Sequence, residues 1–261
     1  MEVSTYLGRI RYAGSREPTA ETLRLIHRAH LFAVPFENLD IPLGQRITLG
    51  MPAFYDKIVR RRRGGFCYEL NGLFSWLLDQ LGYRVSMLSA RVFHGDTFGP
   101  EFDHMVLRVE LDEAWIADVG FGDCFLEPLR LGPGEQHDGS YQLIESGSDW
   151  ILQRRSPESE WISQYAFSLT PRRLDEFAPM CHFQQTSPDS IFTRKSVCSI
   201  ATPEGRVTLS NGRLIVTTEG RREERAVEDS DDYRALLASP FGVTLPNEAP
   251  IEKLSHERNR T

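Results

Sequence analysis

The sequence has few cysteines, no long apolar run and no surplus of positive charge. Its four cysteines are far apart and include no C-x-x-C pair, which excludes a zinc-finger framework and a disulfide-rich scaffold. No stretch approaches the roughly 18 apolar residues that a membrane-spanning helix needs. The first residues also lack the charged and apolar segments of a secretion signal. We therefore expect a reduced, cytoplasmic protein with no membrane partner.

The net charge of −7 argues against general affinity for nucleic acid, because phosphate binding depends on clustered cations. We interpret the one basic run, residues 60–63, as the solvated end of a helix. The G-x-S-x-G and Walker lysine motifs are absent, and Gly120-Phe121-Gly122 lacks the third glycine of a dinucleotide site. No histidine or cysteine spacing is typical of a metal site, so we expect no metal.

One cysteine stands where a nucleophile would be favoured. Gly64-Gly65-Phe66-Cys67 opens the clearest helical pattern in the chain, and Gly82 is placed to end it. A thiol at a helix N-terminus meets unpaired backbone N–H groups and the positive end of the helix dipole, which lower its pKa. We expect the glycine pair to let a substrate approach the backbone. The alternative is a buried cysteine that serves as a small apolar residue. The apolar stripe recurs at helical spacing: Leu70, Leu73, Phe74, Leu77, Leu78 and Leu81.

The order of patterns along the chain predicts an α+β fold. Helices are expected from Thr19 and from Pro52, so that the chain up to Gly82 is helical. A mainly β section follows. Ser210-Asn211-Gly212 then predicts a hairpin turn, and a short helix is expected over residues 231–237. The predicted strands cover residues 85–92, 105–111, 115–119, 141–144, 150–154, 161–169, 206–209 and 213–217.

A catalytic thiol needs a base, and the base needs an acceptor that orients it. Of the seven histidines, His104 is the one that opens a predicted strand. Asp118 ends the next strand, so a hairpin places both residues at the same end of a sheet. A two-residue turn would set Asp118 opposite Leu107, about 10 Å along the strand from His104. Spacing alone therefore leaves their contact open. His27 and His30 fall on a helix face and are interpreted as structural.

Several segments in this order resemble the arylamine N-acetyltransferase family, almost from end to end. The resemblance implies that Cys67 is the nucleophile, His104 the base and Asp118 the orienting acid. It also implies a papain- or transglutaminase-like active site in a fold of three parts: a helical bundle (1–82), a β-barrel-like domain (83–190) and an α/β lid (191–261). The matching segments are Pro35-Phe36-Glu37-Asn38-Leu39, Arg63-Gly64-Gly65-Phe66-Cys67-Tyr68-Glu69, His104, Asp118-Val119-Gly120-Phe121-Gly122, Ser187-Pro188-Asp189-Ser190-Ile191-Phe192 and Phe241-Gly242-Val243-Thr244-Leu245.

The family's chemistry implies the partners. Acetyl-CoA would be an acyl-donor substrate, not a permanently bound cofactor, and the acceptor an arylamine, hydrazine or arylhydroxylamine. Phe36, Phe121, Asp123 and Phe125 fall where the family lines its amine pocket, although an acidic residue at 123 departs from the pattern. We assign no residue to CoA binding and no oligomeric state.

Three alternatives remain open. An amide synthase of the same fold would use the same triad without CoA to close a macrolactam on a polyketide, and a cysteine hydrolase would pass the acyl group to water. A non-catalytic binding protein would keep the scaffold without a reactive thiol. Four polar residues around the cysteine are expected to form a buried network, because buried charges need partners. These residues are Glu37, Asn38, Arg63 and Glu69.

Overall fold

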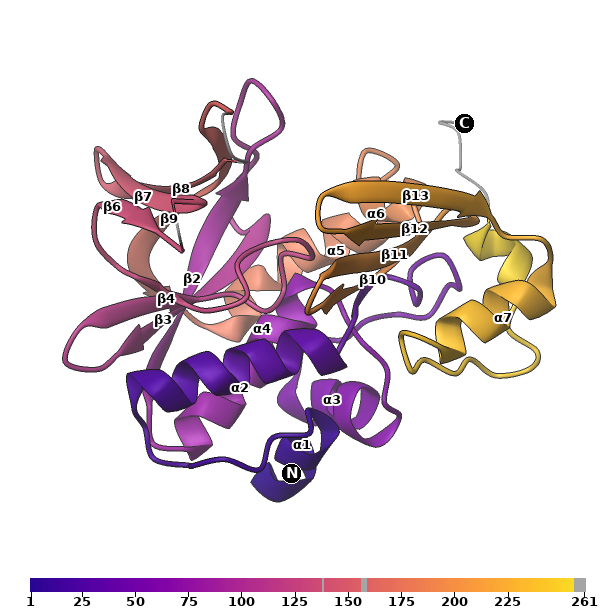
Figure 1. Ribbon diagram of the computed structural model, residues 1–261, viewed down its shortest axis with the longest axis horizontal. Coiled ribbons are helices and arrows are strands. Elements are labelled where there is room, and N and C mark those ends of the chain that lie inside the picture. Colours follow the sequence, from indigo (N-terminus) through magenta and orange to yellow (C-terminus); the bar gives the residue numbers. More distant parts are fainter. Residues whose placement is uncertain (138, 156–158, 256–261) are drawn as a thin grey trace.

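The computed structural model describes residues 1–137, 139–155 and 159–255, and its first part is helical (Figure 1). The Thr19 side chain accepts the backbone N–H of Thr22 and so caps α2, as the sequence predicts. Gly82, with φ +90°, follows α4 in the left-handed conformation that ends helices. The helices are α1 (Val3–Arg9), α2 (Ala20–Ala33), α3 (Met51–Tyr55), which continues into the π-helix η1 (Asp56–Arg60), and α4 (Cys67–Gln80).

An eight-stranded antiparallel sheet follows and curls into a barrel-like shape beside the helices (Figure 1). Its strand order is β5-β4-β3-β2-β9-β8-β7-β6. Leu107 and Val109 of β3 pack with the apolar face of α4, whereas Val106 faces the interior of the curled sheet. Both faces of the central strands are therefore buried. The strands are β2 (Arg84–Val92), β3 (His104–Glu110), β4 (Ala114–Ala117), β5 (Leu129–Arg130), β6 (Gly134–Gln136), β7 (Tyr141–Ser146), β8 (Asp149–Arg154) and β9 (Ile162–Arg172).

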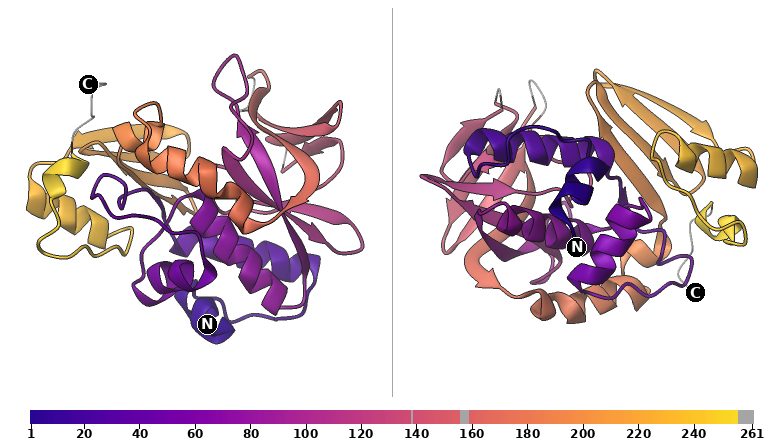
Figure 2. Two further views of the ribbon diagram at one scale, coloured as in Figure 1. Left: turned by 180° about the vertical axis from the view of Figure 1, so that it is seen from behind. Right: turned by 90° about the horizontal axis from the view of Figure 1, so that it is seen from below.

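A second sheet stands on the other side of the helical part, away from the curled sheet (Figure 2). Its order is β1-β10-β11-β12-β13, and a separate apolar cluster joins it to α7 and η3. Between the sheets run η2 (Leu174–Phe177), α5 (Ala178–Thr186) and α6 (Ile191–Arg194). The remaining elements are β1 (Phe36–Glu37), β10 (Val197–Thr202), β11 (Gly205–Ser210), β12 (Arg213–Thr218), β13 (Arg221–Ala226), α7 (Ser230–Ala238) and η3 (Ile251–Leu254).

The strand β1 ties the first part of the chain to the last. Phe36 pairs with Ser199 and Glu37 with Cys198, both in β10, and Phe36 also forms a bridge with Gly65 in the loop before α4. The predicted boundaries of the three parts remain a prediction. Although β1 lies within residues 1–82, it is a strand of the last sheet. Within the described residues, none of the helices has the length and apolarity needed to cross a membrane.

Candidate active site

Cys67 is the first residue of α4, as predicted, and the glycines before it serve protein packing. A Cβ on Gly64 would lie 2.0 Å from the carbonyl oxygen of Pro35, and one on Gly65 would lie 2.8 Å from Cβ of Glu69. The loop can therefore pass β1 and the start of α4 only without side chains at these positions. The expected role of the pair, to admit substrate to the backbone, is replaced by this close contact with the protein itself.

The environment of the thiol differs from the one predicted for a helix N-terminus. Burial raises the pKa of the Cys67 thiol well above its usual value, and the nearby Asp103, Cys181 and Asp118 add to the shift. The prediction of a lowered pKa is wrong because burial, the largest cause of the shift, acts in the opposite direction. A lone thiolate at this position is therefore costly.

His104 and Asp118 are in contact, a point that the spacing of the predicted strands leaves open. Leu107 pairs with Ala117 and not with Asp118, so the strands differ by one residue from the expected alignment. This shift places Asp118 on the same face as His104, because a one-residue slip turns side chains to the opposite face of a sheet. The His104 Nε2 lies 2.8 Å from Oδ2 of Asp118, and both side chains are buried.

The carboxylate of Asp118 is held by several donors. Asn71 of α4 donates to its Oδ1 over 2.8 Å, and the backbone N–H of Gly120 donates over 2.9 Å. Burial alone would raise the pKa of Asp118, but the charge and hydrogen bond of His104 and the bonds from Asn71 and Gly120 hold it below its ordinary value. Asp118 is therefore a carboxylate that can accept the Nε2 proton of His104. The sequence prediction missed Asn71. A polar residue that interrupts an otherwise apolar helix is the signal that would have found it.

A cavity of about 450 Å³ is lined by residues of α4, of both sheets and of the segment between them, including Cys67 and His104. Aromatic rings form much of its wall, and the Phe121 ring packs edge-on to His104 with centroids 5.2 Å apart. Such a space has the size and the largely apolar lining of a small-molecule site. The aromatic residues in the wall are Phe36, Phe121, Phe183 and Phe192.

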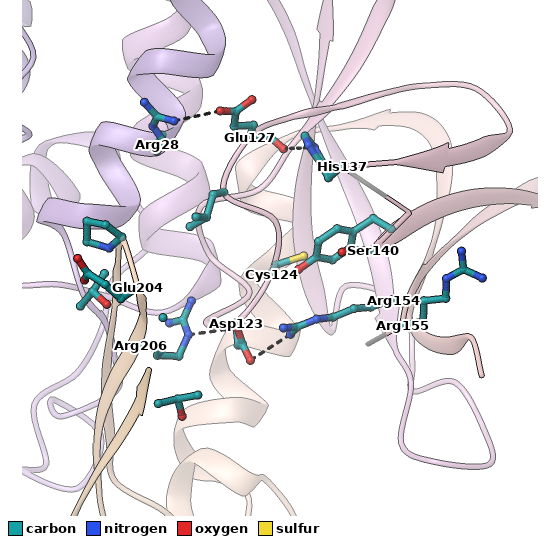
Figure 3. A pocket seen from close by; sticks show the side chains of 16 residues that line it. Arg28, Asp123, Cys124, Glu127, His137, Ser140, Arg154, Arg155, Glu204 and Arg206 are labelled. Carbon is teal, nitrogen blue, oxygen red and sulfur yellow. Dashed lines mark hydrogen bonds and ion pairs between the residues drawn. The ribbon is translucent and has the colours of Figure 1, made fainter. Parts of the chain in front are cut away.

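Two of the residues predicted for the amine pocket lie elsewhere. Phe125 is buried in the core of the curled sheet and is only 1% exposed. Asp123 lines a different cleft, of about 610 Å³, where it bridges Arg154 of β8 and Arg206 of β11 over 3.1 Å each (Figure 3). The acid that departs from the family pattern thus joins the two sheets and does not line the cavity that contains Cys67.

A buried network of charges supports the loop before Cys67. Arg63 donates to both oxygens of Glu37, over 2.9 and 3.0 Å, and to Asp40 over 2.8 Å. Lys57 lies 2.8 Å from Asp40 and 2.9 Å from Glu69. The sequence prediction missed Lys57 and Asp40; a lysine on the apolar face of a helix is the signal that would have found the first.

Asn38, predicted to belong to this network, has another task. Its Nδ2 donates to the carbonyl oxygens of Phe192 and Lys195, over 3.0 and 2.7 Å, and its Oδ1 accepts the Val197 N–H over 2.8 Å. It therefore fixes the segment that carries the far wall of the cavity. Among the described residues, no group of three or more His, Cys, Asp or Glu side chains is arranged to hold a metal ion.

Comparison with known proteins agrees with this geometry. A protein family described as N-acetyltransferase matches residues 19–249. The pineal gland arylamine N-acetyltransferase isozyme NAT-3 of Gallus gallus is 39% identical, over 94% of this chain and 95% of its own. The proansamycin X synthase of Amycolatopsis mediterranei is 32% identical, over 91% and 95% of the two chains. The structure of the Mycobacterium marinum arylamine N-acetyltransferase in complex with CoA superposes with a TM-score of 0.85 at 33% identity, covering 93% of each chain. This chain belongs to the arylamine N-acetyltransferases, a family of acyltransferases.

Proposed function

We propose that the protein transfers an acetyl group from acetyl-CoA to an arylamine, hydrazine or arylhydroxylamine through an acetyl-cysteine at Cys67. The observation that carries this proposal is the bond to Asp118 made by His104, which lines the same cavity as Cys67. A base held by a buried carboxylate beside a thiol at a helix N-terminus is the arrangement that nucleophilic acyl transfer requires. The related structure in complex with CoA supports acetyl-CoA as the acyl donor.

In the first half-reaction, Nδ1 of His104 takes the proton of Cys67 as the sulfur attacks the thioester carbonyl. The new S–C bond forms, the bond from carbon to the CoA sulfur breaks, and CoA leaves with the proton from His104. Because burial makes the lone thiolate costly, the proton moves to a base whose positive charge Asp118 stabilises. The backbone N–H groups at the start of α4 are placed to stabilise the oxyanion.

In the second half-reaction the amine nitrogen attacks the acetyl-cysteine. The N–C bond forms, the S–C bond of Cys67 breaks, and His104 carries the amine proton to the departing thiolate. Amines of low basicity suit this site because they are neutral near pH 7 and need no prior loss of a proton. We assign Phe36 and Phe121 to the acceptor pocket because both line the cavity beside Cys67. Phe125 belongs to the core, and Asp123 to the contact between the sheets.

We further propose that the enzyme acts in the cytoplasm on foreign aromatic amines and hydrazines. The amide synthase remains the second candidate, because one relative is named for the synthesis of proansamycin X. The cavity that contains Cys67 also bears on this alternative: its volume of about 450 Å³ suits a small aromatic acceptor better than a polyketide chain long enough to close a ring.

The release of CoA separates these functions in one experiment. Acetyl-CoA added without amine should release about one CoA per enzyme in a rapid burst and then almost none, and an arylamine should restore turnover. Steady release without amine would identify a hydrolase. Absence of the burst from an enzyme whose Cys67 reacts readily with iodoacetamide would exclude acetyl-CoA and favour the amide synthase. The matched control is Cys198→Ala, a buried cysteine of the last sheet that should leave the burst intact.

A further inference from the structure

A histidine of the helical part holds both ends of the loop that carries Asp118 and Phe121. His27 lies in α2, where the sequence suggested a structural role on a helix face. Its Nε2 lies 3.1 Å from the backbone nitrogen of Asp118, and its Nδ1 lies 2.8 Å from the carbonyl oxygen of Leu126. One ring therefore binds the backbone where residues 118–126 leave β4 and again where they return.

The two partners fix the tautomer of this ring. The backbone N–H of Asp118 only donates, so Nε2 of His27 must accept. The carbonyl of Leu126 only accepts, so Nδ1 must carry the proton. Both bonds exist together only in the neutral ring. Burial lowers the pKa of His27 to about 4, against the raising effect of the Leu126 bond, so the ring stays neutral near pH 7.

The ring is also held on its faces. It is fully buried, stacks on Phe125 with centroids 5.7 Å apart and meets Phe74 of α4 edge-on at 5.9 Å. Phe125 belongs to the same loop, so stacking and hydrogen bonds act on one segment. Loss of the ring's two polar atoms would leave the buried N–H of Asp118 and the partly buried carbonyl of Leu126 without these partners, and the loop would have to move to satisfy them.

We propose that His27 is a positioning residue that sets the backbone of Asp118, and through it the carboxylate that orients His104. This inference rests on the proposed function of Cys67, His104 and Asp118. Asn71 and Gly120 hold the Asp118 carboxylate itself, whereas His27 holds the main chain from which that carboxylate projects. The bond to Asp118 is the one that acts on the triad, and the bond to Leu126 anchors the far end of the loop.

Three substitutions separate these two bonds. His27→Phe keeps an aromatic ring between Phe74 and Phe125 but removes both hydrogen bonds. His27→Gln places an amide oxygen near the position of Nε2 and can still accept from Asp118, whereas His27→Asn places an amide nitrogen near Nδ1 and can still donate to Leu126. The matched control is His30→Phe, which changes a buried histidine of the same helix that also packs on Phe74 but bonds to the Tyr6 hydroxyl.

The measurement is the rate of Cys67 alkylation by iodoacetamide near pH 7, followed by intact-protein mass spectrometry well below each variant's melting temperature. We expect His27→Phe to react about 10- to 100-fold more slowly, the size of effect that a small displacement of a reacting group produces. His30→Phe should lower the melting temperature and keep the wild-type rate, and His27→Gln should react faster than His27→Asn.

Equal rates for wild type, His27→Phe and His30→Phe would overturn the proposal. If His27→Phe does not fold, the order of the other two variants decides, and an asparagine variant as fast as the glutamine variant would contradict it. His104→Gln separates a failure of the proposed function. If that variant is alkylated as fast as wild type, His104 does not activate the thiol, and the fault lies with the triad.

Discussion

The nucleophile and the acid of the candidate triad are supported in opposite ways. The loop before Cys67 rests on five buried charged side chains, whereas the backbone at Asp118 and Val119 is held by the uncharged side chains of His27 and Asn71. The charged support titrates near neutral pH, since burial raises the pKa of Glu69 to about 7. The neutral support does not, because the pKa of His27 lies near 4. The difference implies that pH near neutrality acts on the stability of the nucleophile loop and leaves the two hydrogen bonds of His27 unchanged. The charged residues are Glu37, Asp40, Lys57, Arg63 and Glu69.

The largest effect is expected from Arg63→Leu, which removes the main partner of Glu37 and one partner of Asp40. An uncompensated buried charge costs about 3–5 kcal/mol. Urea denaturation should show a loss of this size in the free energy of unfolding. The matched control is Arg61→Leu, an exposed arginine paired with Asp56, for which less than about 1 kcal/mol is expected. Similar losses in the two variants would show that the buried network contributes no more than surface charges.

The next effect concerns the contact between the two supported loops. A Cβ on Gly120 would lie 2.9 Å from Cα of Cys67 and 2.7 Å from Nδ2 of Asn71. Gly120→Ala should therefore push the Asp118 loop from the nucleophile and slow acetyl transfer by about 10- to 100-fold. The single-turnover rate with acetyl-CoA measures this effect. Gly132→Ala, where nothing lies within 4 Å of the added atom, should keep the wild-type rate.

Glu69→Gln tests the charged support by its pH dependence. The pKa of Glu69 rises from 4.5 in the unfolded chain to about 7 in the folded protein, so the folded state keeps a proton that the unfolded state has released. The contribution of this bound proton to the free energy of unfolding is full below pH 4.5 and is lost as pH rises toward 7. The free energy of unfolding of the glutamine variant should match that of wild type near pH 5 and exceed it by on the order of 2 kcal/mol at pH 8. A wild-type advantage that grows with pH would contradict this sign.

The smallest effect is expected for Asp123→Asn. Its carboxylate joins Arg154 and Arg206 across the second cleft, but its side chain is 59% exposed (Figure 3). Exposed ion pairs contribute about 0–1 kcal/mol, and salt screens them. We expect a loss of less than about 1 kcal/mol that shrinks further in 1 M NaCl, with no change in arylamine KM. A large change in KM would return Asp123 to the acceptor pocket.

The sequence predicted several of the elements that depend on local patterns, although α1, α5, β10 and β13 were not expected. Thr19 caps α2, Cys67 opens α4, and the turn at Ser210-Asn211-Gly212 joins β11 to β12, because caps, helical periodicity and turn residues act over a few neighbours. The two-residue strand β1 was missed, since its pairing with β10 lies some 160 positions along the chain.

The predictions that failed at the site failed for the same physical reason, since they depend on contacts between residues far apart in the sequence. The contact of His104 with Asp118 depends on a register that was wrong by one residue, and spacing could not correct it. The thiol pKa was wrong in direction because burial is a property of the folded protein. His27 looked like any histidine on a helix face, since both of its partners are backbone atoms about a hundred residues away. Only the assembled fold shows such roles.

The most direct test of the account is intact-protein mass spectrometry after mixing with acetyl-CoA, for wild type, Cys67→Ala and Asp118→Asn. We expect one acetyl adduct on wild type, discharged by an arylamine, none on Cys67→Ala, and slow formation on Asp118→Asn. An adduct on Cys67→Ala, or none on a wild-type protein whose Cys67 is demonstrably reactive, would contradict acetyl transfer through this cysteine.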